Sequence, residues 1–353
     1  MFFWWEKLFP YQPIIWRNKL SITFFGELML RLTPAQPQQR LMVAQQLSVD
    51  FAGAEANVAA ALARLGVATD FITKLPDNLI AEQAIASLHR CGIATNNVLF
   101  GGERMGTYFI ELGASLRPTR VIYDRKYSAI STIVENEFNW NEILQGKQRL
   151  HLSGITPALS EQCALETIKA AKIAHGMGVR VSFDLNFRRS LWPEPAFAKH
   201  YFKQIMQYCD LVFANAGVIS DVFGYHFFNS DALAEAQAVA EFLGDEFNVD
   251  AAVTSRIHHS ASVNSLTSLL RKNADSFKST ELRVDILDRL GTGDAFAAGV
   301  LYGYQQAWSA QQTIDFANAA FALAHNCYGD QAWMSEAEIN EVARGNTAGY
   351  VVR

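Results

Sequence analysis

The stretch Asp288–Gly299, which reads DRLGTGDAFAAG, carries residue types that can act in phosphoryl transfer. Gly291 and Gly293 allow a backbone turn in which successive N–H groups point the same way. A helix that begins at this turn adds its unpaired N–H groups and the positive end of its dipole. Such groups form an anion hole for a phosphoryl group, and Asp294 can accept the proton of an attacking hydroxyl. The spacing is therefore compatible with catalytic roles for Asp294, Gly291, Thr292 and Gly293.

Other interpretations of this stretch remain open on spacing alone. A Gly-x-Gly turn before a helix is common, and an Asp near a helix start is often only a cap. The stretch is not the dinucleotide fingerprint, because Phe296 stands where that motif needs a small residue. The segment 101–107 (GGERMGT) lacks the lysine of a P-loop.

Strands that alternate with helices are expected to position this turn. Apolar and β-branched runs alternate with helical patterns of about 10–15 residues, which indicates βαβ units and a mostly parallel sheet. The expected strands are 21–25, 67–75, 149–152, 179–186, 210–215, 251–256 and 282–287. The expected helices are 53–65, 79–92, 160–175, 195–208, 233–243, 294–306 and 311–325. The fold class predicted from this order is α/β.

Two segments, about 28–47 and 101–125, do not fit the alternation and predict a small accessory β-sheet, a lid inserted near the first βα unit. We expect one domain over 21–345, a C-terminal tail over 346–353 and an N-terminal extension over 1–20. The extension holds three of the seven tryptophans, and its charges and prolines interrupt any signal-peptide core. A surface extension and a tether to a membrane or partner are both open interpretations.

Composition excludes several classes of protein. The chain has 353 residues with 30 Lys and Arg against 35 Asp and Glu, so general nucleic-acid binding through a basic surface is not expected. Half of the residues are hydrophobic, which is too many for a disordered chain. No apolar run is long enough for a membrane span. The four cysteines are too far apart for a CxxC pair, so we expect free thiols and a cytoplasmic location.

The stretch around the turn resembles the D-T-x-G-A-G-D signature of the ribokinase-like (PfkB) carbohydrate kinases. Asp288, Gly291, Gly293 and Asp294 match, and the Asp-Arg-x-Gly-x-Gly-Asp form is that of the 2-keto-3-deoxygluconate kinases. The resemblance extends over about 20–341. It implies a three-layer α/β sandwich with a mostly parallel central sheet and a small β lid.

Further matches imply a set of substrate-binding residues. The segment 51–59 resembles the family's G-G-A-x-x-N-x-A motif, with Ala52 in place of the first glycine. The segment 123–129 resembles Y-D-R-x-x-S-A, and the segment 184–188 resembles D-x-N-x-R. A guanidinium in these segments suits the carboxylate of a 2-keto acid. A single surface arginine is more often only solvated. The substrate residues implied are Gly53, Asn57, Arg104, Tyr108, Tyr123, Arg125 and Arg188.

The resemblance also implies residues for ATP, with Mg²⁺ held through the ATP phosphates and water and with no protein metal ligand. The nucleotide-binding residues implied are Asn215, Thr254, Arg256, Gly291, Gly293 and Asn318. Val218 departs from the family's N-x-x-E motif, whose Glu helps to organise Mg²⁺, and this departure weakens what the resemblance implies about the metal and the turnover rate.

Together the matches imply an ATP-dependent kinase that phosphorylates 2-dehydro-3-deoxy-D-gluconate at its 6-hydroxyl. Two alternatives stay open: a kinase for a neutral sugar such as fructose or ribose, and a sugar-sensing binding protein with weak catalysis. The expected partners are a sugar acid and ATP, with a homo-oligomer through the lid as a further option. We expect the pKa of Asp294 to stay low because the residue lies at a helix start.

Overall fold

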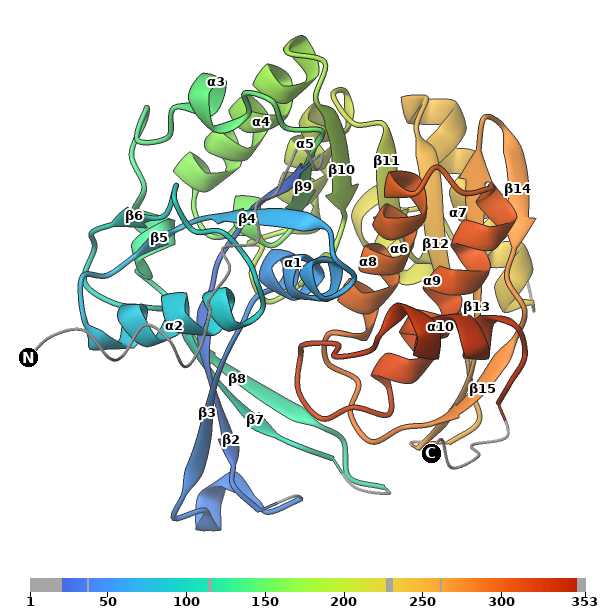
Figure 1. Cartoon of the computed structure of the whole chain (residues 1–353), viewed down its shortest axis with the longest axis horizontal. Coiled ribbons are helices and arrows are strands. Elements are labelled where there is room, and N and C mark those ends of the chain that lie inside the picture. Colours follow the sequence, from blue (N-terminus) through green and yellow to red (C-terminus); the bar gives the residue numbers. More distant parts are fainter. Residues whose placement is uncertain (1–20, 37, 114–115, 227–230, 261, 348–353) are drawn as a thin grey trace, which may run out of the picture.

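The computed structural model describes residues 21–36, 38–113, 116–226, 231–260 and 262–347. In this part of the chain a nine-stranded sheet has the order β14-β13-β12-β11-β10-β9-β1-β4, with β15 also paired to β13 (Figure 1). All pairs from β12 to β4 are parallel, and those made by β13 are antiparallel. The strands are β1 (Ser21–Phe25), β4 (Ala68–Ile72), β9 (Arg149–Ser153), β10 (Arg180–Asp184), β11 (Leu211–Ala214), β12 (Asp250–His258), β13 (Val263–Lys272), β14 (Asp275–Lys278) and β15 (Leu282–Asp285).

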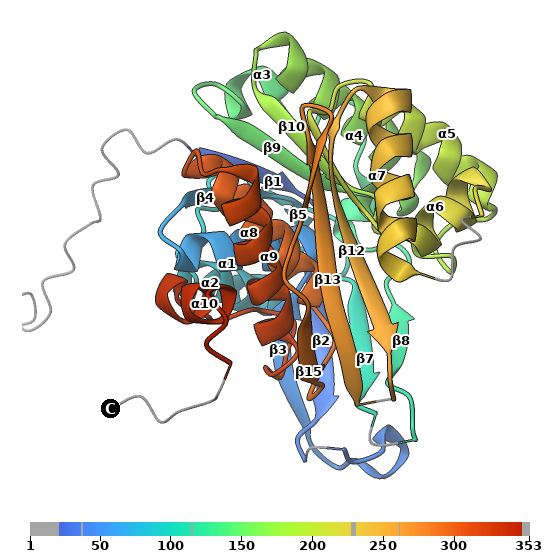
Figure 2. The ribbon, with the colours of Figure 1, turned by 90° about the vertical axis from the view of Figure 1, so that its right-hand side faces the viewer.

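Helices cover both faces of the sheet (Figure 2). One layer contains α1 (Ala54–Arg64), α2 (Leu79–Arg90), α8 (Thr292–Gln305), α9 (Ala310–Ala324) and α10 (Glu336–Ala343). The other contains α3 (Trp140–Ile143), α4 (Glu161–Gly176), α5 (Pro195–Met206), α6 (Ala216–Phe223) and α7 (Ala232–Phe247). The arrangement confirms the predicted three-layer α/β sandwich.

Neighbouring side chains of a strand point to opposite faces of the sheet and so pack into two separate hydrophobic cores. Phe24 belongs to the core under α1 and α8, whereas Phe25 belongs to the core under α4 and α5. Phe213 and Val212 divide in the same way on β11. Strands covered on both faces have apolar side chains at consecutive positions, which explains why only 18% of the residues are charged.

A second sheet, the lid, extends from the large body in Figure 1. Its order is β3-β2-β7-β8, built from β2 (Met29–Pro34), β3 (Leu47–Ala52), β7 (Thr107–Glu111) and β8 (Arg120–Asp124). The sequence predicted lid segments at 28–47 and 101–125. β3 lies almost wholly beyond the first predicted segment: it begins at Leu47, and only its last two residues are buried.

Short elements complete the described chain. They are β5 (Lys74–Leu75), β6 (Leu99–Phe100) and the 3₁₀ turns η1 (Leu41–Val43), η2 (Ala129–Thr132) and η3 (Thr156–Ala158). The predicted extension 1–20 and residues 348–353 of the predicted tail lie outside the described residues. Within those residues, no helix has the length and apolar character that a membrane crossing requires.

Candidate active site

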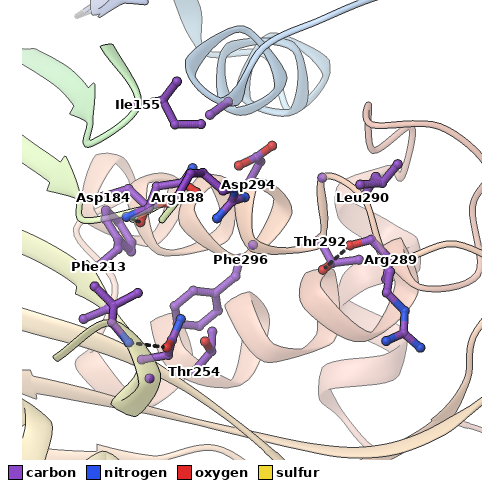
Figure 3. A pocket seen from close by; sticks show the side chains of 18 of the residues that line it. Ile155, Asp184, Arg188, Phe213, Thr254, Arg289, Leu290, Thr292, Asp294 and Phe296 are labelled. Carbon is purple, nitrogen blue, oxygen red and sulfur yellow. Dashed lines mark hydrogen bonds between the residues drawn. The ribbon is translucent and has the colours of Figure 1, made fainter. Parts of the chain in front are cut away.

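A cavity of about 550 Å³ lies between the lid, the N-terminal ends of α1 and α8, and the carboxyl ends of β10, β11 and β12. The carboxyl ends of parallel strands are where open α/β sheets bind ligands. Figure 3 shows Asp184, Arg188 and Asp294 gathered at one end of this cavity and Arg289 with Leu290 at the other. The predicted site residues that line it are Gly53, Asn57, Tyr108, Tyr123, Arg125, Arg188, Asn215, Thr254, Arg256, Gly291, Thr292, Gly293 and Asp294.

The turn before α8 has a fixed backbone. Asp288 accepts hydrogen bonds from the N–H groups of Arg289 (2.7 Å) and Leu290 (3.2 Å) through Oδ1. Gly291 has φ 67°, and a Cβ there would overlap the carbonyl oxygen of Asp330. A Cβ at Gly293 would meet no protein atom within 4 Å. The fold therefore requires the first glycine, whereas the second leaves open space in the cavity at the start of the helix.

Asp294 lies in the first turn of α8 and touches α1. The Nδ2 atom of Asn57 donates a hydrogen bond to its Oδ2 at 2.7 Å. Burial raises the pKa of Asp294 well above its ordinary value, the Asn57 hydrogen bond opposes that shift, and the charge of Asp184 adds to it. The expectation of a low pKa was wrong, because loss of water around the carboxyl outweighs the favourable helix start.

Positive charge gathers beside the turn. Arg188, Arg256 and Arg289 all line the cavity. The Nη2 atom of Arg256 donates a hydrogen bond to Oγ1 of Thr292 at 3.4 Å. The same guanidinium lies 4.8 Å from the ring centre of Phe321. Burial, followed by repulsion from Arg289 and Arg188, lowers the pKa of Arg256 to about 10, so it stays a cation at neutral pH. Three guanidinium groups next to an N–H-rich turn form a site suited to a polyphosphate.

The lid side of the cavity contains Arg125 and two tyrosines. Arg125 is buried, forms an ion pair with Glu27, and lies 5.4 Å from the ring centre of Tyr123. Its Nε atom is buried and finds no hydrogen-bond partner among the described residues. Tyr108 donates from its hydroxyl to Oδ2 of Asp330 at 2.9 Å. The guanidinium is therefore paired with Glu27 and stacked beside Tyr123 at the wall of the cavity, with its Nε enclosed by protein.

Two predicted residues lie elsewhere. Arg104 does not line the cavity; it pairs with Asp124 at 2.8 Å on the exposed edge of the lid. Asn318 also lies away from the cavity and is only 1% exposed. Its Oδ1 accepts from Ser268 Oγ at 2.8 Å and its Nδ2 donates to the carbonyl of Thr280 at 2.9 Å, so it joins α9 to the sheet.

The nucleotide side of the cavity is built from strand ends and helix starts. Asn215 caps α6 by accepting from the N–H of Val218 at 3.0 Å, and Thr254 lines the cavity from β12. Glu235 of α7 also lines the cavity and was not anticipated. In the described ranges no group of three or more His, Cys, Asp and Glu side chains is placed to hold a metal ion.

Glu27 is a second residue that sequence reasoning missed. It lies two residues after β1, is only 2% exposed, and accepts from Ser128 Oγ at 2.6 Å as well as from Arg125. Its place directly beyond the carboxyl end of a central strand was the available signal. Nothing in the local sequence shows that the arginine almost a hundred positions later is its partner.

Comparisons with known proteins agree with this geometry. The model of the pfkB family of carbohydrate kinases matches residues 19–337. A 2-dehydro-3-deoxygalactonokinase of Haloferax volcanii is 31% identical over 93% of this chain and 98% of its own, and a 2-dehydro-3-deoxygluconokinase of Bacillus subtilis is 28% identical over 88% and 91%. The solved 2-dehydro-3-deoxygluconokinase of Thermotoga maritima has a TM-score of 0.89 and 37% identity, covering 92% of this chain and 100% of that one. The chain therefore belongs to the pfkB family of carbohydrate kinases, as the sequence resemblance predicted.

Proposed function

We propose that this sugar kinase transfers the γ-phosphoryl group of ATP to the 6-hydroxyl of 2-dehydro-3-deoxy-D-gluconate. The observation that carries the proposal is Arg125, which lines the same cavity as Asp294 together with Tyr108 and Tyr123. A guanidinium at a cavity wall can bind a carboxylate with two hydrogen bonds. The 2-dehydro-3-deoxy acids named for the relatives have such a carboxylate.

In the proposed reaction, different residues of the chain accept the proton, stabilise the phosphoryl group and bind the two substrates. Asp294 accepts the proton of the 6-hydroxyl, whose oxygen forms a bond to the γ-phosphorus while the bond to the β,γ-bridging oxygen breaks and ADP leaves. The N–H groups of the Gly291–Gly293 turn stabilise the charge on the phosphoryl oxygens. Arg188 and Arg256 bind the polyphosphate, and Tyr108, Tyr123 and Arg125 hold the acid. Asp294 with a raised pKa is a stronger base than an exposed carboxylate.

The donor set fits a metal that is held through the ATP phosphates and water. Asp184 and Glu235 line the cavity, but the described residues offer no cluster of three ligands. Mg²⁺ keeps several waters and needs few protein ligands when phosphates supply the rest. The ion would neutralise charge on the phosphates, and the two carboxylates would accept hydrogen bonds from its waters.

The test is a coupled ADP-release assay with the acid, its galactonate epimer, fructose and ribose. We expect turnover on the acids, and we expect Arg125→Gln to lower their kcat/KM about ten- to hundred-fold, because it removes a charge-assisted carboxylate contact. Arg104→Gln is the matched control, since it removes a lid arginine outside the cavity. Equal losses on acidic and neutral sugars would contradict the proposal. Should Arg125→Gln misfold, the sugar panel on the wild type still decides between the classes.

A neutral-sugar kinase is the second candidate. Glu27 forms an ion pair with Arg125 and so neutralises its charge. A neutralised guanidinium favours a neutral ligand over a carboxylate. A fructokinase-1 of Zea mays is 26% identical over 86% of this chain. Efficient turnover of fructose with none of the acids would select this candidate. Sugar binding without ADP release from any sugar would instead select a sugar-sensing protein.

We also propose that two copies associate through the outer face of the lid. The strand registers place Val49, Leu32, Phe109 and Ile122 in one row across all four lid strands. Val49 and Ile122 are 48% and 57% exposed, an apolar surface that a second copy would cover. Light scattering should show a dimer that Ile122→Glu dissociates and that Leu79→Glu, an equally drastic change on α2, leaves intact. A monomeric wild type would overturn the proposal.

We place the reaction in the cytoplasm. All four cysteines are free, and burial raises the pKa of the thiols of Cys163 and Cys209, which keeps them unreactive. Fractionation of the producing cells tests this placement, and recovery of the protein outside the cytoplasmic fraction would contradict it.

A further inference from the structure

Arg31, a residue of the lid strand β2, contacts two carboxylates of the large body. It is only 3% exposed. Its guanidinium forms an ion pair with Asp330 and a second one with Asp288, where Nη2 and Oδ2 are 3.6 Å apart. Its Nε donates to Oγ1 of Thr33 at 3.0 Å, which fixes the direction of the side chain. One lid side chain therefore bridges two acids from distant parts of the chain.

Both carboxylates belong to the framework of the phosphate-binding turn. Asp288 binds the first N–H groups of the turn through Oδ1, and its Oδ2 accepts from the N–H of Gly329 at 3.2 Å. The backbone carbonyl of Asp330 packs against Gly291 so closely that no side chain fits there. Arg31 thus holds the two segments that enclose Gly291.

The same lid row faces the sugar side of the cavity. The strand registers pair Arg31 with Tyr108 and Tyr108 with Tyr123. Tyr108 and Arg31 both bind Oδ2 of Asp330, and both tyrosines line the cavity. A ligand that fixes the tyrosines therefore also fixes the strand that carries Arg31.

We propose that Arg31 is a positioning residue that couples the lid to the phosphate-binding turn. Its contacts form only when the lid lies against the body, and they bring Asp288 and Asp330 together around Gly291. Without this cation the two buried carboxylates repel each other and the turn loses its fixed position. The inference rests on the kinase activity of the chain, and it does not depend on which sugar is the acceptor.

The experiment compares Arg31→Met, Arg31→Lys and Arg104→Met with the sugar that gives the highest turnover in the panel. Arg104→Met is the matched control, because it removes a lid ion pair that has no contact with the turn. We expect Arg31→Met to lower kcat about ten- to hundred-fold, the size of effect that a misplaced catalytic group produces. The KM for the sugar should change much less. The kcat of Arg31→Lys should lie between those of the wild type and Arg31→Met, because one ammonium group cannot bridge both carboxylates.

Hydrogen exchange supplies a readout that global destabilisation would not reproduce. With sugar and a non-hydrolysable ATP analogue bound, the amides of 289–293 and Gly329 should exchange faster in Arg31→Met than in the wild type. Those of the central strand β10 should exchange at the wild-type rate. Unchanged exchange in the turn, or a kcat equal to that of Arg104→Met, would overturn the proposal.

Thr33→Val keeps the test possible if Arg31→Met does not fold. It removes one neutral hydrogen bond to the guanidinium, so we expect a smaller loss of kcat, about five-fold, with the same local exchange pattern. Wild-type kinetics and exchange in Thr33→Val would count against the coupling. Failure of the sugar acids in the panel would overturn the proposed substrate alone, because the coupling is measured with whichever sugar reacts.

Discussion

Asn57 and Asp294 touch: the amide Nδ2 of the first donates to the carboxylate Oδ2 of the second at 2.7 Å. The contact joins the first turns of α1 and α8, which the chain supplies more than two hundred residues apart. Burial favours the protonated acid, whereas the amide favours the carboxylate. The pair therefore places a carboxyl whose pKa is raised, and which is a stronger base once ionised, where the proposed mechanism needs a proton acceptor.

The first prediction concerns Asp294 itself. Asp294→Asn keeps the size of the side chain and removes the base, so we expect kcat to fall at least about 10²- to 10⁴-fold. ATP affinity, measured by calorimetry, should stay within a few-fold of the wild type because the arginines and the turn are intact. Retained turnover would show that another group accepts the proton.

The second prediction concerns the pH dependence of turnover. Removing the hydrogen bond in Asn57→Ala takes away a contribution that lowers the pKa of Asp294, so that pKa should rise further. The acidic limb of kcat/KM against pH, which reports the free enzyme, should then move to higher pH. If the acidic limb stays at the same pH while kcat/KM falls, Asn57 acts in substrate binding and not on the pKa of Asp294.

Local pattern was enough to predict the parallel strands of the large sheet and the turn before α8, because buried strands have apolar runs and the turn has its glycines. It could not reveal that Glu27 pairs with Arg125 or that Arg31 bridges Asp288 and Asp330. Those contacts depend on how the lid lies on the body. The antiparallel strands β13 and β14 were also missed, since serines interrupt the apolar run of the first.

The pKa of Asp294 shows a different limit of the sequence. A helix start is visible in the sequence, but the amount of protein around a carboxyl is not. The prediction from the sequence included the favourable interaction of Asp294 with the helix dipole and left out the larger cost of burying its carboxyl. Asn318 shows a related limit: the family resemblance implied a place beside the nucleotide, whereas in the structure its side chain binds Ser268 Oγ and the Thr280 carbonyl.

The third prediction separates the two glycines of the turn. Gly291→Ala must adopt φ 67° and displace the carbonyl of Asp330, so we expect it to lower the free energy of unfolding by at least about 1–3 kcal/mol. Gly293→Ala should unfold like the wild type yet lose turnover, because its methyl occupies cavity space. Urea unfolding and steady-state assays of both variants test this. Normal activity in Gly293→Ala would show that the phosphoryl group does not approach this position.

The fourth prediction concerns Asn318. Asn318→Ala leaves Ser268 Oγ and the Thr280 carbonyl without their partner, so the free energy of unfolding should fall by about 1–3 kcal/mol. The KM for ATP should not change, since the side chain does not line the cavity. A raised KM with unaltered stability would restore the role near adenine that the family resemblance implied.

The fifth prediction concerns Glu55, which is buried in α1 and accepts from Ser153 Oγ at 2.7 Å and Thr156 Oγ1 at 2.9 Å. Burial raises its pKa from 4.5 to about 7, which the two hydroxyl hydrogen bonds oppose. A pKa that is higher in the folded than in the unfolded protein means that the folded protein binds the proton more tightly. The stability contributed is therefore fully present below about pH 4.5 and is lost as the pH rises through about 7.

Glu55→Gln removes that dependence. The free energy of unfolding of the wild type should fall relative to that of the variant between pH 5 and 8, by at most about 3 kcal/mol, the equivalent of the raised pKa. Asp184, whose pKa burial raises to about 6, titrates in both proteins, but its charge also raises the pKa of Glu55, so the difference reports Glu55 together with its coupling to Asp184. Urea unfolding at several pH values measures it. A constant difference across this range would mean that Glu55 stays ionised in the folded protein, with the hydroxyls of Ser153 and Thr156 offsetting the cost of its burial.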